Sequence, residues 1–99
     1  MTKRIVEFRG EQCRVLFRKY DSNDRIAIQL TIDGTGEPMA TATSNLAEEE
    51  IVHSKQTFIK DYSENSGILE VLIAAGIVKD TGVKKRSGFC EYTLVDVLV

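Results

Sequence analysis

Few of the side chains that perform catalysis in proteins occur in this sequence with a suitable partner nearby. His53 is the only histidine and lies in a polar stretch, whereas the two cysteines, Cys13 and Cys90, lie far apart in strand-like runs. A nucleophilic thiol needs a base within hydrogen-bond reach and surroundings that lower its pKa. Neither cysteine has such a setting, so we expect two structural thiols and no enzymatic activity.

Metal and phosphate sites are not favoured by the spacing of their usual residues. A zinc site would have to recruit His53, both cysteines and an acidic group from scattered positions, because no Cys-x-x-Cys pair occurs. Gly34-Thr35-Gly36 is similar to a glycine-rich phosphate loop, but Pro38 follows it in place of a helix. A hairpin turn is the simpler interpretation, and we expect no cofactor.

Two clusters of charge remain as candidate contact sites. Lys84-Lys85-Arg86 is predicted to lie on a loop near Phe89 and Tyr92, where it could contact phosphates. The simpler interpretation is a solvated turn whose charge prevents edge-to-edge pairing of the final strand. Glu48-Glu49-Glu50 is either a solvated loop or a negatively charged contact patch. A formal net charge of −2 does not supply the broad positive field of a duplex binder.

The size and composition fit one globular domain, residues 1–99. Hydrophobic residues make up 42% of the 99 positions and charged residues 28%, which is an ordinary globular mixture. No apolar run approaches the ~20 residues that a membrane helix requires. Glu7 and Arg9 interrupt the apolar segment that a signal peptide would need. We therefore expect a cytoplasmic protein without a membrane segment.

Alternation of apolar and polar residues predicts several β-strands. Residues 4–8 and 13–18 alternate on either side of Arg9-Gly10-Glu11, which predicts a hairpin. Residues 25–32 form the clearest strand pattern, residues 39–43 a fourth strand and residues 57–60 a short further one. Residues 79–83 are predicted to turn, and residues 89–99 form the final strand.

Residues 68–75 are predicted to form the principal helix. Residues 61–67 are rich in capping residues and lead directly into it, and Gly76 suits the left-handed position just past its end. Glu70 is its only charged residue, whereas a surface helix normally has a polar face. The pattern β-β-β-β-(β)-α-β predicts an α+β fold: a mainly antiparallel sheet of four to six strands with one principal helix packed on it.

Much of the chain resembles a small family of proteins of unknown function. The likeness is carried by residues 58–69, 75–78 and 87–89, and also by residues 25–30 and the N-terminal hairpin. Members of that family have about this length and occur in gut-type bacteria, their phages and mobile elements. The resemblance implies no catalytic residue. It implies an accessory protein of a phage or mobile element, or of a bacterial genome that carries one.

Taken together, these features favour a non-enzymatic protein-interaction module. It is expected to be a homodimer or a phage or mobile-element protein that binds a host factor, for example as a defence inhibitor. The candidate contact residues are Leu69, Leu72 and Ile73, because so apolar a helix must be covered either by its own fold or by another chain.

Two alternative functions stay open. One is a nucleic-acid-binding accessory protein that uses Lys84, Lys85 and Arg86. The other is an enzyme or small-ligand-binding protein with Tyr62, His53 or Cys90 in a cleft. Light scattering, nucleic-acid binding at low salt and inspection of the clefts discriminate among the three.

Overall fold

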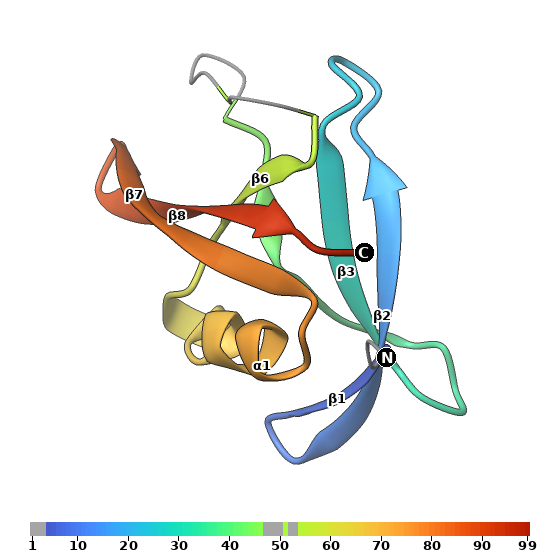
Figure 1. Ribbon diagram of the computed structural model, residues 1–99. Coiled ribbons are helices and arrows are strands. Elements are labelled where there is room, and N and C mark those ends of the chain that lie inside the picture. The colour runs from blue at the N-terminus through green and yellow to red at the C-terminus, as the bar shows by residue number, and fades with distance from the viewer. Residues whose placement is uncertain (1–3, 47–50, 52–53) are drawn as a thin grey trace.

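The computed structural model describes residues 4–46, 51 and 54–99, and this part of the chain contains eight strands and one α-helix (Figure 1). All strand pairs are antiparallel. The α+β class, with mainly antiparallel strands and one helix, is therefore confirmed. The strands are β1 Ile5–Phe8, β2 Glu11–Lys19, β3 Ile26–Ile32, β4 Pro38–Thr41, β5 Thr43–Ser44, β6 Gln56–Ile59, β7 Val78–Ser87 and β8 Cys90–Val97. The helix α1 is Ile68–Ala74, preceded by a 3-10 turn at Ser63–Asn65.

The strands form two sheets rather than the one sheet that the sequence predicted. Their orders are β1-β2-β3-β4 and β5-β6-β8-β7. The chain passes from the first sheet to the second at Ala42, which interrupts the strand predicted over residues 39–43. The amide of Ala42 donates to the Ile28 carbonyl (2.8 Å), and its carbonyl accepts from the amide of Lys60 (2.9 Å). Ala42 is fully buried, so its small side chain allows the two sheets to approach here.

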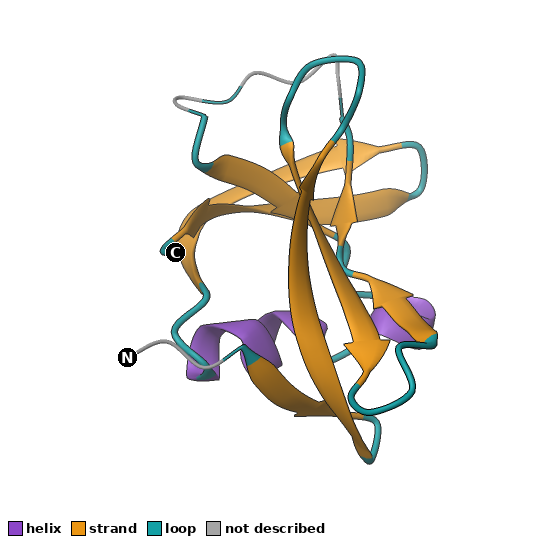
Figure 2. Cartoon of the chain, turned by 90° about the vertical axis from the view of Figure 1, so that its right-hand side faces the viewer, coloured by secondary structure: helices purple, strands orange, loops and turns teal. Residues whose placement is uncertain are grey.

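The main hydrophobic core lies between the two sheets and α1. Figure 2 shows the helix at one end of the pair of sheets. Alternate residues of a strand point to opposite faces, so the second sheet also contributes to a smaller cluster on its other face. The main core includes Val15, Ile28, Leu30, Ile59, Leu72 and Val95; the smaller cluster is Leu46, Phe58, Tyr92 and Leu94.

Both ends of α1 are fixed by the residues that predicted them. The carboxylate of Asp61 accepts hydrogen bonds from the amides of Gly67 (2.9 Å) and Leu69 (3.2 Å), so it satisfies donors at the helix start. Gly76 has a φ of 74°, and the amide of Ile77 donates to the Leu72 carbonyl at 3.0 Å. This is the glycine-terminated helix end that the sequence predicted.

The turns of the first sheet also agree with the sequence. Arg9 and Gly10 have φ values of 54° and 81°, the two positive values of a tight hairpin turn between β1 and β2. Gly34-Thr35-Gly36 lies in the turn between β3 and β4, where the Gly36 amide donates to the Ile32 carbonyl at 2.8 Å. The prediction of a hairpin turn rather than a phosphate loop is confirmed.

The prediction of a turn over residues 79–83, with the basic triplet on a loop, is wrong. β7 continues through this segment, and its register with β8 shifts between Asp80 and Lys84. The Asp80 carboxylate accepts from the Gly82 amide (2.8 Å), and the Thr81 hydroxyl donates to the Leu94 carbonyl (2.7 Å). The turn-forming residues therefore make a bulge inside the strand, because their side chains replace the missing ladder bonds.

Candidate interaction surface

The structure places the three candidate residues of the helix in different environments. Leu69 and Leu72 lie in the main core with exposed fractions of 8% and 0%, whereas Ile73 is 41% exposed. The first two are therefore core residues, and the fold itself covers that side of the helix. Val71 is half-buried against the same core and Ala74 is exposed, and both line a groove of about 280 Å³ between α1 and β1.

The basic triplet lies on an edge strand. β7 is the outermost strand of the second sheet, and all its residues after Val78 are exposed or half-buried. Lys84 and Arg86 stand opposite Thr93 and Glu91 on one face, and Lys85 stands opposite Tyr92 on the other. The Lys84 ammonium donates to the Thr93 hydroxyl at 3.1 Å. The triplet is therefore spread over both faces of a strand instead of clustered on a loop.

The tip of the β7–β8 hairpin carries an exposed aromatic residue that the sequence did not single out as a contact residue. Phe89 follows Gly88, whose φ of 63° suits a two-residue turn with glycine first, and its side chain is fully exposed. Val83, in the bulge, is also exposed. The sequence signal was present in Ser87-Gly88, which predicts a turn, but Phe89 was assigned to the following strand.

The half of this hairpin nearest the turn packs on the smaller cluster through Cys90 and Tyr92 of β8. The hydroxyls of Tyr62 and Tyr92 are 3.1 Å apart, and their rings meet edge to face with centroids 5.8 Å apart. Cys90 packs against the same cluster. Tyr62 and Cys90, two of the three residues that one alternative function places in a cleft, both pack against this cluster. Neither lines the groove beside α1 or the one on the first sheet.

Tyr62 is expected to make stability depend on pH in the alkaline range. Its hydrogen bonds with Tyr92 and Cys90, and then burial, raise the pKa of Tyr62 above its ordinary value of 10.0. Above that pH the unfolded chain loses this proton first, so the folded state loses stability as the pH rises. Above pH 10, the free energy of unfolding measured in urea should fall more steeply with pH for the wild type than for Tyr62→Phe. If the free energy of unfolding depended on pH in the same way for both proteins, the hydrogen-bonded contact of Tyr62 would be contradicted.

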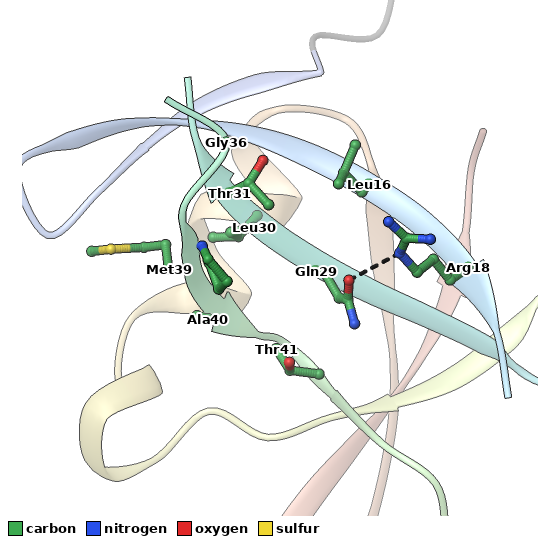
Figure 3. A pocket seen from close by; sticks show the side chains of 10 residues that line it. Leu16, Arg18, Gln29, Leu30, Thr31, Gly36, Met39, Ala40 and Thr41 are labelled. Carbon is green, nitrogen blue, oxygen red and sulfur yellow. Dashed lines mark hydrogen bonds between the residues drawn. The ribbon is translucent and has the colours of Figure 1, made fainter. Parts of the chain in front are cut away.

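A groove of about 390 Å³ lies on the first sheet, beside β4 (Figure 3). Leu16, Gln29, Thr31 and Thr41 lie along it, and the Arg18 guanidinium donates to the Gln29 side-chain oxygen at 3.1 Å. Among the described residues that line it, none is a nucleophile paired with a base, and only Arg18 is charged. We interpret it as a solvated sheet face.

Within the described part of the chain, the cysteines do not form a reactive or metal-binding site. Cys13 and Cys90 are both free thiols, and burial, with a smaller contribution from Glu11, raises the pKa of the Cys13 thiol. A raised pKa makes this thiol a poor nucleophile at neutral pH. Among the described residues, no group of three His, Cys, Asp or Glu side chains is arranged to hold a metal, and no helix is long and apolar enough to cross a membrane. His53 and Glu48-Glu49-Glu50 lie outside the described residues.

Comparison with known proteins identifies a family. A family model described as a domain of unknown function, DUF4313, matches residues 14–99. The match includes α1 and the whole β7–β8 hairpin, and the prediction of a family of unknown function is confirmed. Searches of the curated proteins and of the solved structures returned no match.

Proposed function

We propose that this chain, which belongs to the DUF4313 family, is a non-enzymatic protein-interaction module that contacts its partner through the β7–β8 hairpin. The observation that carries the proposal is the position of Phe89 at the tip of a hairpin whose edge strand bears three consecutive cations. Figure 1 shows this tip extending away from the body of the molecule. Exposed aromatic and arginine side chains are enriched among the residues that contribute most to binding protein partners.

The charge of the hairpin favours a protein partner over a nucleic acid. Its cations are Lys79, Lys84, Lys85 and Arg86, and its acidic residues are Asp80, Glu91 and Asp96. Four positive and three negative side chains give a net charge of +1, on a chain whose formal net charge is −2. A surface that binds the phosphate backbone depends on a field of many uncompensated cations. Local positive charge beside an apolar tip suits a protein surface with an acidic rim.

The setting we propose is that of a phage or mobile-element accessory protein whose partner is a host factor, with inhibition of a defence system as one form. The small size of the chain and the apolar composition of its main core support a role in binding. A cytoplasmic location is supported by the two free thiols, which a reducing compartment maintains.

Site-specific photo-cross-linking in the native host tests this proposal. A photoreactive phenylalanine analogue in place of Phe89 should give one dominant adduct with a protein, whereas the same analogue at Leu98, another exposed apolar site, should give none. Ile73 serves as the third position, because it reports contact through the helix. A dominant adduct at Ile73 alone, equal labelling at all three positions, or an adduct that nuclease removes would each overturn the proposal.

A further inference from the structure

We propose that the partner presents an extended acidic segment, which adds to the outer edge of β7 as a further strand of the second sheet. This inference rests on the proposed function and specifies the chemistry of the partner. It concerns the segment Lys84–Ser87, which lies between the bulge and the turn.

The position of β7 supplies the backbone groups for this contact. In the part of the chain that the structure describes, β8 is the only strand paired with β7. An edge strand presents its outward N–H and C=O groups to any extended segment that approaches. Val78 is buried near α1, whereas residues 84–87 form the half of β7 nearest the turn, where they are exposed or half-buried and their register with β8 is regular.

The other edge strands of the two sheets are less suited to pairing with an added strand. β4 begins with Pro38, which lacks an amide hydrogen, and β5 has two residues. β1 has four residues and contacts α1, whose side chains narrow the approach to it. β7 is the longest strand, with ten residues, and thus provides the most extended edge.

The side chains of β7 determine the sign of the partner's charge. Lys84 and Arg86 point to the same face, so a strand added beside them would place alternate side chains of its own directly opposite. A second copy of β7 pairing in this segment would bring cations against cations, which is unfavourable. Carboxylates at alternate positions would meet Lys84 and Arg86 instead, in the way that Glu91 already faces Arg86 across the hairpin. The same cations that prevent self-pairing therefore select an acidic strand.

Binding of designed peptides tests the inference without knowledge of the partner. The probes are two capped peptides of about eight residues, one alternating Glu and Val and the other alternating Lys and Val. In low salt, the Glu peptide should shift the backbone amide resonances of residues 84–87 in an isotope-labelled sample, and the Lys peptide should not. The double variant Lys84→Glu with Arg86→Glu should weaken this binding by roughly tenfold or more. The matched reversal on β2, Arg18→Glu with Lys19→Glu, should leave it unchanged.

Backbone methylation distinguishes strand addition from mere charge attraction. Two further Glu-Val peptides carry N-methyl groups, each on one of the two alternating sets of amides. Strand addition predicts that one of them loses binding and the other keeps it, because only one set faces β7. Three results would each overturn the inference. They are equal binding of the two methylated peptides, no resonance shift at residues 84–87 with the Glu peptide, and binding of the Lys peptide as tight as that of the Glu peptide. Cross-linking through Phe89 would still stand in those cases, so the proposed function is tested separately.

Discussion

Replacing Leu72 with alanine is expected to lower the free energy of unfolding by about 3 kcal/mol. Leu72 is completely buried in the main core, where α1 packs against the two sheets. The truncation removes apolar contacts and leaves a cavity that surrounding β-strands cannot readily close. A domain of this size is stabilised by roughly 5–15 kcal/mol in total, so the loss is a large share of it.

Ile73→Ala is the matched control, since it alters the next residue of the same helix. Ile73 is 41% exposed, and its truncation should cost less than about 1 kcal/mol. Urea unfolding followed by circular dichroism measures both values. Equal losses at the two positions would mean that the helix is oriented differently from the arrangement described, or that another chain covers Ile73.

Signals that are local in sequence predicted most of the elements. The positive φ values at Arg9 and Gly10 follow from a glycine between two alternating runs, and the end of α1 at Gly76 follows from the glycine and the apolar residue after it. A cap within residues 61–67 was also predicted, because polar side chains precede an apolar helical run, but only the structure identifies Asp61 as the acceptor.

Features that depend on distant contacts were not predicted. The division into two sheets arises where Ala42 turns the chain between β3 and residue 60, and no local pattern marks that position as a sheet boundary. The predicted helix, residues 68–75, is apolar almost all round, so periodicity alone could not tell the buried Leu72 from the exposed Ile73. The positions of β1 and β7 beside the helix decide which of its sides is covered.

The candidate surface was identified in part. The Lys84-Lys85-Arg86 cluster was visible as a charge pattern, but Gly82 and its polar neighbours resembled a turn, and only the pairing with β8 shows them as a bulge. Phe89 was visible as a hydrophobic residue, and its exposure depends on where the hairpin turns relative to the core. Residue type and spacing do not contain that information.

Phe89→Ser is expected to reduce affinity for the cross-linked partner by about thirtyfold, which corresponds to roughly 2 kcal/mol for the loss of an aromatic anchor. The substitution should leave folding intact, because Phe89 contributes nothing to either hydrophobic cluster. Leu98→Ser removes a comparable exposed apolar side chain outside the hairpin and should change the affinity by less than about threefold.

Isothermal titration of the purified partner into wild type, Phe89→Ser and Ile73→Ser is the most direct measurement of whether the hairpin is the contact surface. If the hairpin is the contact surface, Phe89→Ser binds weakly and Ile73→Ser binds nearly as tightly as the wild type. Contact through the hairpin would be contradicted if Phe89→Ser bound as tightly as the wild type while Ile73→Ser lost affinity.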